Sequence, residues 1–328
     1  MGRLGTIWKE IRQDSKEISQ IINKNRTLIM FDMIGCLLKY KASPNNYKKF
    51  EFYNLKSKQR KTYVTYGLSR KMIKTFNKPE DIYVLEDKVV FAEKFSKYFK
   101  RKFLNTETMD FEAFEEFCQG QEKFVCKPSN GSQGQGIVVY HINDNLKEIF
   151  EEIKSNYNKS YMLEEWIKQH ESLSKIYPNA VNCLRIITAY NGKETKFLTG
   201  GITFGLSTEI ANGSQPSIVA PVDFNTGILH KPASTFGDDL YENHPTTGEP
   251  IKGFQVPYWN EIIQMLKDIC AELPTVGYIG WDVAITPDGP IVIEGNTTPG
   301  YKYYQIPKHL ENGIGNKHIY EDALKNRK

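Results

Sequence analysis

The stretch Gly280 to Gly300 reads GWDVAITPDGPIVIEGNTTPG, and no other stretch of the sequence is as informative about the fold. Two runs rich in valine and isoleucine flank Pro287-Asp288-Gly289, a combination typical of a tight turn. We therefore predict a β-hairpin centred near Asp288. In that register Asp282 and Glu294 are direct cross-strand neighbours, with their Cβ atoms about 5 Å apart.

A divalent cation is the expected partner of this carboxylate pair. Asn296 follows Glu294 by two positions and so shares its strand face. Facing carboxylates in an apolar hairpin repel each other unless one is protonated or a cation lies between them. Carboxylate and amide oxygens suit Mg²⁺, which takes water and phosphates at its remaining positions. The sequence predicts that Asp282, Glu294 and Asn296 bind Mg²⁺, with Mn²⁺ as an alternative ion. The alternative to a metal site is that Asp282 is a turn or cap residue and that Glu294 pairs with a surface lysine.

A second informative stretch, Phe124 to Tyr140, reads FVCKPSNGSQGQGIVVY. Lys127 ends an apolar run, and the glycines of the loop Ser129 to Gly136 let backbone N–H groups approach an anion. The next run is a strand rather than a helix, which excludes a P-loop. The loop is either a plain hairpin turn or a flap over phosphates, and the metal site favours the flap. The expected phosphate-binding residues are Lys127, Ser132, Gly134 and Gly136.

The segment Tyr161 to Ile167, YMLEEWI, reads as a strand that leaves its sheet at Glu164, Glu165 and Trp166. Such a segment can offer backbone groups to the edge of an adenine, while a carboxylate accepts from its amino group and an indole covers its side. The alternative is an ordinary core tryptophan with surface glutamates.

The rest of the pattern predicts a mixed α+β chain with mainly antiparallel sheets. Helices are expected over the first two dozen residues, within 87–103, after Asp110, and over 145–157 and 258–271. Strands are expected at 124–128, 136–141, 161–165, 182–190, 196–205, 217–223, 278–286 and 290–295.

Composition excludes several classes of protein. The 43 basic residues nearly balance the 39 acidic ones, so charge alone does not indicate nucleic acid binding. The five scattered cysteines disfavour a disulfide framework or a structural zinc site. With no apolar signal segment or membrane span in the sequence, we expect a cytoplasmic protein.

The N-terminal part differs in composition from the rest. Its first two dozen residues predict an amphipathic helix packed on the main body, with a membrane-surface or partner role as the alternative. Residues 41–80 mix lysines with aromatic residues, a pattern more typical of a solvated face with buried rings than of nucleic acid binding.

This order of motifs resembles the ATP-grasp superfamily over about Asp87 to Tyr304. The resemblance implies an α+β fold in which two α+β subdomains with antiparallel sheets grip ATP, preceded here by a helical N-terminal segment. It implies that Lys88 meets the α-phosphate, Glu164 the adenine amino group and Glu171 the ribose. It also matches Lys127 to the flap-strand lysine, and Asp282, Glu294 and Asn296 to the metal ligands. The expected parts are 1–80, 81–165 with the flap, and 166–328 with the metal site.

The sequence resembles one branch of this superfamily still more closely, the sugar-transfer-associated ATP-grasp proteins of polysaccharide biosynthesis. The similar stretches include NCLRIIT (182–188) and IGWDVAITPDGPIVIEGN (279–296). An unpaired cation is costly to bury, so Arg185, within the first of these, is expected to face the transferred phosphate as a catalytic residue. The alternative is a salt bridge to a core carboxylate. The sequence departs from the family in two respects. It shows no N-terminal α/β substrate domain like that of the amino acid and peptide ligases, and Gly280 stands where the D-alanine ligase-like members have an arginine.

The resemblance implies an ADP-forming ligase that joins a carboxylate, of a sugar acid or amino acid, to an amine through an acyl phosphate. Its product would serve a cell-surface polysaccharide such as a capsule. Two alternatives stay open, a kinase that phosphorylates a hydroxyl, and a non-catalytic ATP-binding scaffold for a glycosyltransferase. The expected partners are ATP, carboxylate and amine substrates, and a glycosyltransferase or the inner membrane surface.

Overall fold

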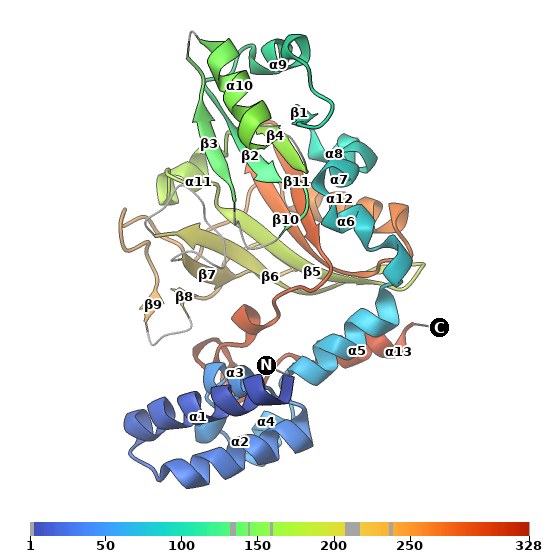
Figure 1. Ribbon diagram of the computed structural model, residues 1–328. Helices are drawn as coiled ribbons and strands as arrows, with labels where there is room; N and C mark the ends of the chain where they lie inside the picture. The colour runs from blue at the N-terminus through green and yellow to red at the C-terminus, as the bar shows by residue number, and fades with distance from the viewer. Residues whose placement is uncertain are drawn as a thin grey trace. The chain divides into compact units, whose positions relative to one another are not determined.

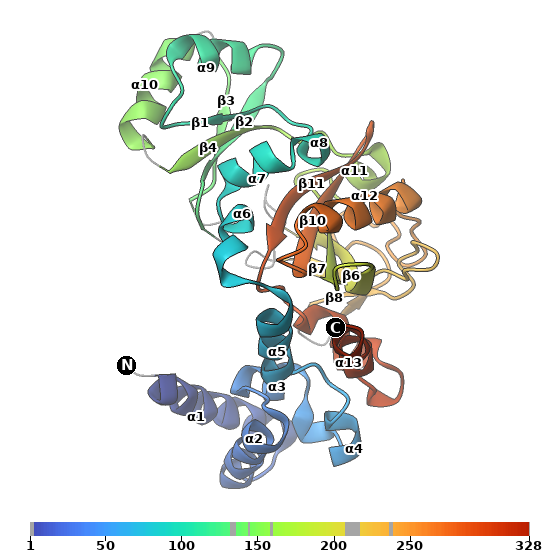
Figure 2. The same cartoon turned by 90° about the vertical axis from the view of Figure 1, so that its right-hand side faces the viewer.

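The computed structural model describes residues 3–131, 136–143, 145–157, 160–206, 217–235 and 239–327. The chain forms two compact units, Met1–Asn77 with Pro299–Lys328, and Lys78–Thr298 (Figures 1 and 2). The C-terminal segment thus belongs to the unit of the N-terminal helices. The three-part division at residues 80 and 165 remains a prediction about subdomains. None of the described helices is long and apolar enough to cross a membrane.

The first unit is helical. The helix expected over the first two dozen residues is confirmed, and it packs against a second helix built from the apolar run that follows it. The Asn25 side chain caps that second helix by accepting from the Thr27 N–H at 2.8 Å. The helices are α1 (Arg3–Ile22), α2 (Arg26–Tyr40), α3 (Pro44–Lys49), α4 (Ser57–Arg60), α5 (Tyr66–Phe76) and α13 (Lys317–Lys325), with short 3₁₀ helices η1 (Phe52–Asn54), η3 (Lys302–Gln305), η4 (Pro307–His309) and η5 (Glu311–Gly313).

Three aromatic residues between 41 and 80 form a buried cluster in this unit. Phe50, Phe52 and Tyr63 are each at most 1% exposed, with ring centroids 5.1 to 5.9 Å apart. The prediction of buried rings in this segment is therefore confirmed.

The second unit contains a four-stranded antiparallel sheet. Its strand order is β1 (Phe103–Asn105), β4 (Tyr161–Glu165), β2 (Lys123–Pro128) and β3 (Val138–His141). Helices α9 (Phe111–Cys118) and α10 (Leu146–Asn156) contribute to its core, in which Phe124 stacks on Tyr140 with ring centroids 5.4 Å apart. As expected, Asp110 caps α9 by accepting from the Ala113 N–H at 2.9 Å.

The same unit holds a seven-stranded antiparallel sheet. In order, its strands are β11 (Gly289–Asn296), β10 (Tyr278–Thr286), β5 (Cys183–Tyr190), β6 (Thr195–Gly205), β7 (Ser217–Pro221), β8 (Ala233–Ser234) and β9 (Leu240–Tyr241). The unit's other helices are η2 (Pro79–Asp81), α6 (Tyr83–Glu86), α7 (Lys88–Lys94), α8 (Ser96–Phe99), α11 (Glu171–Ile176) and α12 (Trp259–Glu272). All eight predicted strands form, and no boundary moves by more than two residues. The short strands β1, β8 and β9 escaped prediction because two or three residues carry no periodicity.

One face of β10 belongs to the core. Trp281 is fully buried, and its Nε1–H donates to Thr188 Oγ1 at 3.0 Å while Phe95 of the α7–α8 turn meets its ring edge-on. Side chains alternate along a strand, so Asp282 points to the opposite face.

The hairpin of β10 and β11 pairs Asp282 with Glu294, as predicted. The turn itself is tighter than a centre at Asp288 implies, because Thr286 pairs with Gly289 across a two-residue loop. Carried along both strands without interruption, that register would pair Asp282 with Ile293 instead.

A β-bulge between the turn and the carboxylates corrects the register. The pairing shifts by one residue beyond Val283, which leaves Ile293 as the extra residue. Without the shift, Glu294 would lie opposite Trp281 and share its core face. The bulge is therefore what brings both carboxylates to one face of the sheet.

Candidate functional site

Arg185 and Asp282 form an ion pair on neighbouring strands. They are direct partners between β5 and β10. The Nε–H and Nη2–H groups of Arg185 donate to the two carboxylate oxygens of Asp282, a bidentate arrangement. This contact matches the alternative interpretation of Arg185, a bridge to a buried carboxylate, and that carboxylate is itself an expected metal ligand.

The three expected metal ligands converge on one point. Asn296 Nδ2 lies 3.2 Å from Glu294 Oε1 and 3.5 Å from Asp282 Oδ2. Burial raises the pKa of Asp282, and Glu294 adds to the rise although Arg185 opposes it. Asp282 is buried and pairs with Glu294 across the hairpin, and two carboxylates in this position carry an electrostatic cost that a cation would relieve.

This donor set fits Mg²⁺. An asparagine amide presents either its oxygen or its nitrogen when it turns about its last torsion, so all three side chains can offer oxygen ligands. Within the described ranges there is no cluster of three or more His, Cys, Asp or Glu side chains. A cation here would therefore bind two carboxylates and an amide, with oxygen ligands from elsewhere.

Lys127 and Glu164 form a buried ion pair in the four-stranded sheet. Lys127 Nζ lies 2.5 Å from Glu164 Oε1, and the two side chains are 7% and 6% exposed. Burial would raise the pKa of Glu164, but Lys127 and Arg101 outweigh it and hold that pKa below its ordinary value. The carboxylate expected to face adenine is thus paired with the lysine expected to bind phosphate.

Arg101 is a residue of this site that the sequence did not reveal. Its guanidinium donates to Glu164 Oε1 at 3.4 Å and to the Val292 carbonyl at 3.0 Å, and it lies 3.7 Å from the centroid of the Phe99 ring. It therefore ties β4 of the small sheet to β11 of the large one. Nothing in the stretch KYFKRKF (97–103) distinguishes it from the lysines around it.

Replacing Arg101 by methionine should lower the free energy of unfolding by about 3 kcal/mol, because it removes one of two cations from a buried carboxylate. Urea denaturation measures this loss. Lys97→Met, an exposed lysine of α8, is the matched control and should cost under about 0.5 kcal/mol. Equal losses in the two variants would contradict this role for Arg101.

Lys88 lies beside the start of the glycine-rich loop. It is the first residue of α7, and its Nζ donates to the Gly131 carbonyl at 2.9 Å. Its backbone N–H donates to the Ser129 carbonyl at 2.9 Å. Burial lowers the pKa of Lys88, and the nearby charge of Lys127 lowers it further. The structure thus places Lys88 and Lys127, the two lysines expected to bind phosphate, close together.

Three positively charged side chains act on the carboxylate of Glu294. Burial alone would raise its pKa, but Lys127, Arg185 and Lys88 together hold it below its ordinary value. The expected phosphate-binding cations therefore act electrostatically on one of the expected metal ligands.

The loop residues expected to bind phosphate are only partly described. Gly136 has a φ of +74°, and a Cβ there would lie 3.0 Å from Pro128 Cγ, so this position favours glycine. Ser132 and Gly134 lie outside the described residues.

Glu165, Trp166 and Glu171 lie apart from these groups. They line a cavity of about 1010 Å³ to which Lys123 also contributes, with its Nζ 3.8 Å from the centroid of the Trp166 ring. The Glu165 carboxylate accepts from the Lys102 N–H at 2.9 Å, and Glu171 pairs with Lys175 at 2.8 Å in α11. The described lining of this cavity includes neither the expected phosphate-binding lysines nor the expected metal ligands.

The lowered pKa of Glu164 predicts an acid-sensitive fold. A buried carboxylate with a depressed pKa stabilises the protein above its ordinary value of 4.5, and this stability is lost as the pH falls through the folded-state pKa. Glu164→Gln should remove up to about 1.4 kcal/mol per pH unit from the slope of stability against pH below 4.5. Urea titrations across this range measure the slope, and identical slopes in wild type and variant would contradict the assignment.

Comparison with known proteins identifies one matching family. Residues 67–317 match the family described as sugar-transfer associated ATP-grasp. No curated protein matches the chain.

Solved structures with weaker similarity share 11% to 16% identity with the chain. They include the ATP-grasp ligase PsnB complexed with minimal precursor, at 11% identity over 76% of this chain and 63% of that one, with a TM-score of 0.45. The D-alanine–D-alanine ligase from Bacillus anthracis has 16% identity over 74% and 67%, with a TM-score of 0.43. N5-carboxyaminoimidazole synthase from Aspergillus clavatus, in complex with ADP and 5-aminoimidazole ribonucleotide, has 12% over 66% and 45%, with a TM-score of 0.42. The chain therefore spans less than two thirds of the first and the last of these.

Proposed function

The chain belongs to the sugar-transfer associated ATP-grasp family and has the ATP-grasp fold, and from this premise we propose that it is an ATP- and Mg²⁺-dependent ligase. It joins the carboxylate of a sugar acid or amino acid to an amine and releases ADP and phosphate. The family's description supports a role in making a cell-surface polysaccharide. We place the reaction in the cytoplasm, where ATP is available.

One observation carries this proposal. The three cations Lys88, Lys127 and Arg185 act together on Glu294, whose cross-strand neighbour Asp282 is buried. Such a combination suits a polyanion that arrives with a divalent cation, as a nucleoside triphosphate does. Structural salt bridges alone would not require Asp282, Glu294 and Asn296 to converge.

The proposed reaction has two steps. A substrate carboxylate oxygen attacks the γ-phosphorus of ATP, and the bond from that phosphorus to the bridging oxygen breaks to release ADP. The amine nitrogen then attacks the carbonyl carbon of the acyl phosphate, which expels inorganic phosphate, and the nitrogen loses a proton to solvent.

The side chains of the site have separate tasks in this scheme. Lys88 and Lys127 hold phosphate oxygens, and Arg185 stabilises the negative charge on the transferred phosphoryl group. Asp282, Glu294 and Asn296 would hold Mg²⁺, which supplies neutralisation of phosphate charge. In this scheme the ion pair between Arg185 and Asp282 is a feature of the protein without bound ATP.

Product analysis tests this proposal. Purified protein incubated with ATP, Mg²⁺ and pooled sugar acids and amines should release ADP and free phosphate only when both substrates are present. Formation of AMP and pyrophosphate would overturn the scheme. Phosphate retained on a hydroxyl product would indicate a kinase, and ATP binding without turnover would indicate a scaffold for a glycosyltransferase.

A further inference from the structure

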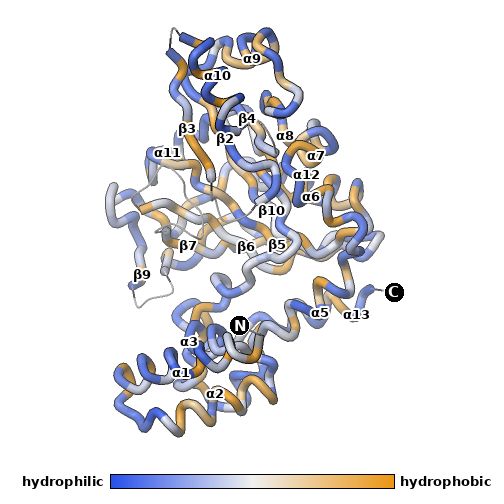
Figure 3. The backbone as a smooth tube through the Cα atoms, in the orientation of Figure 1, coloured by the Kyte–Doolittle hydropathy of each residue, from blue (hydrophilic) through white to orange (hydrophobic). Residues whose placement is uncertain are grey.

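Helix α2 of the first unit is apolar on two sides, and among the residues that the structure describes it packs through only one of them. Ile29, Met33 and Cys36 face inward and are at most 4% exposed. Leu28, Phe31 and Leu38 are 67% to 68% exposed, in the stretch that Figure 3 colours largely as hydrophobic. At 100° per residue these three fall within an arc of about 80°, so they form one outer face.

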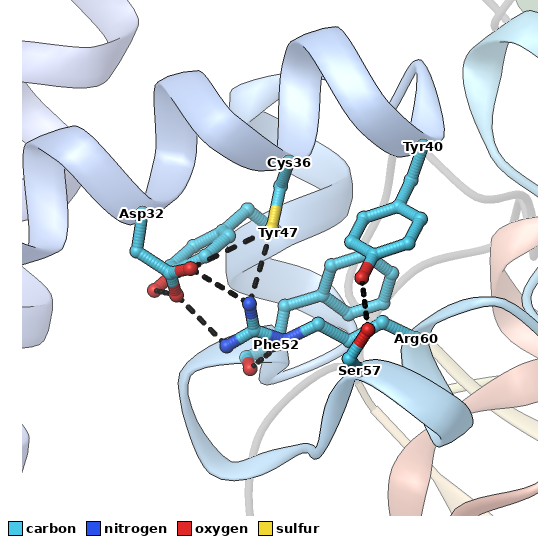
Figure 4. A network of polar contacts seen from close by, with 7 residues as sticks. All are labelled: Asp32, Cys36, Tyr40, Tyr47, Phe52, Ser57 and Arg60. Carbon is cyan, nitrogen blue, oxygen red and sulfur yellow. Dashed lines mark hydrogen bonds and ion pairs between the residues drawn. The ribbon is translucent and has the colours of Figure 1, made fainter.

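A polar network fixes which side of α2 points inward. Asp32 is the only acidic residue of the helix, and Arg60 donates to its two carboxylate oxygens at 2.7 and 2.8 Å. Tyr47 O–H donates to the same carboxylate at 2.7 Å, and Arg60 also contacts Cys36 Sγ at 3.3 Å (Figure 4). The one negative charge on α2 is therefore paired with an arginine, and the outer face carries none.

Cations flank this outer face at both ends. Lys24 precedes α2, and Lys39 and Lys41 lie at its end, whereas the Arg26 guanidinium donates to Ser15 Oγ and the Arg12 carbonyl of α1. All three lysines are exposed. A helix with an exposed apolar face and flanking basic residues has the properties of one that lies in a membrane interface.

We propose that α2 lies along the surface of a membrane containing anionic lipids. Leu28, Phe31 and Leu38 enter the boundary between head groups and acyl chains, while the lysines at both ends contact lipid phosphates. The helix is 15 residues long, which suits lying in the interface rather than crossing the bilayer. This inference does not depend on the ligase proposal.

Charge complementarity favours a lipid surface over a second copy of the chain. In an antiparallel pair of α2 helices, Lys24 of one copy would meet Lys39 and Lys41 of the other. A parallel pair would place identical cations together. Neither arrangement supplies an acidic partner, whereas an anionic membrane neutralises both ends at once.

Vesicle sedimentation of the full chain tests the proposal. The protein should sediment with vesicles of phosphatidylcholine mixed with phosphatidylglycerol, and much less with phosphatidylcholine alone. Combined Leu28→Ser, Phe31→Ser and Leu38→Ser should weaken binding at least about tenfold. The matched control combines Leu240→Ser and Ile314→Ser, which are 44% and 46% exposed elsewhere in the chain and should bind as wild type does.

A second variant covers the case in which the triple variant fails to fold, as judged by circular dichroism. Lys39→Glu with Lys41→Glu changes only exposed charges and should weaken binding to the mixed vesicles at least about tenfold, with added salt weakening wild type likewise. The proposal is overturned if wild type ignores anionic vesicles, binds both lipid compositions equally, or forms a dimer that the triple variant abolishes.

Discussion

Replacing Glu294 by glutamine should lower the kcat of ATP turnover by about 10³-fold, because the substitution removes one charged ligand from the proposed Mg²⁺ site. Glutamine keeps the size of the side chain and its contact with Asn296, so the fold should persist. Glu294 is a sharper test than Asp282, whose replacement would also break the ion pair with Arg185. A coupled assay of ADP release measures the effect.

A matched control comes from the same hairpin. Asp288 is an exposed carboxylate in the two-residue turn, and Asp288→Asn should retain wild-type turnover. Wild-type activity in Glu294→Gln, together with an intact fold by circular dichroism, would contradict the assignment of Glu294 as a metal ligand.

Replacing Lys127 by methionine should have two large effects. Glu164 would keep only the more distant Arg101 at 3.4 Å, so the free energy of unfolding should fall by about 3 kcal/mol. ATP affinity should also fall at least about tenfold, because a cation that binds phosphate in the proposed site is lost. Urea denaturation measures the first effect and calorimetric titration with ATP the second.

The two effects separate the structural role of Lys127 from its binding role. Combining Lys127→Met with Arg101→Met and Glu164→Gln removes all three charges of the buried cluster and should recover part of the stability but none of the affinity. Lys267→Met, an exposed lysine of α12, is the control for a lost positive charge. Unchanged ATP affinity in Lys127→Met would refute its role in binding phosphate.

The fold was largely predictable because its strands carry strong local signals. The runs around Lys127 and Asp282 are rich in β-branched residues and end at glycine-containing or proline-containing turns. The pairing of Asp282 with Glu294 was predicted from a turn centred at Asp288. It forms because the tighter turn and the bulge at Ile293 offset each other. A bulge depends on packing across the sheet, so spacing alone could not reveal it.

The rest of the site depends on contacts between distant segments. Arg101 meets Glu164 and Val292 through the arrangement of two sheets, for which no short motif exists. The strand predicted to leave its sheet supplied roles for Glu165 and Trp166, and the resemblance to ATP-grasp proteins supplied one for Glu171. The structure places all three around a separate cavity. Those roles remain predictions, as do those of Ser132 and Gly134 in the loop.

The outer face of α2 was also beyond the reach of sequence alone. The run Leu28 to Leu38 is apolar nearly all round, which is typical of a buried helix. Only the pairing of Asp32 with Arg60 establishes which side is inward and leaves Phe31 exposed.

The most direct test of the central claim is a calorimetric titration of the protein with a non-hydrolysable ATP analogue, with and without Mg²⁺. The proposed site predicts that Mg²⁺ tightens binding at least about tenfold in wild type and has little effect in Glu294→Gln. An affinity that does not depend on Mg²⁺ in wild type, or that responds equally in both proteins, would contradict a nucleotide-bound metal at Asp282, Glu294 and Asn296.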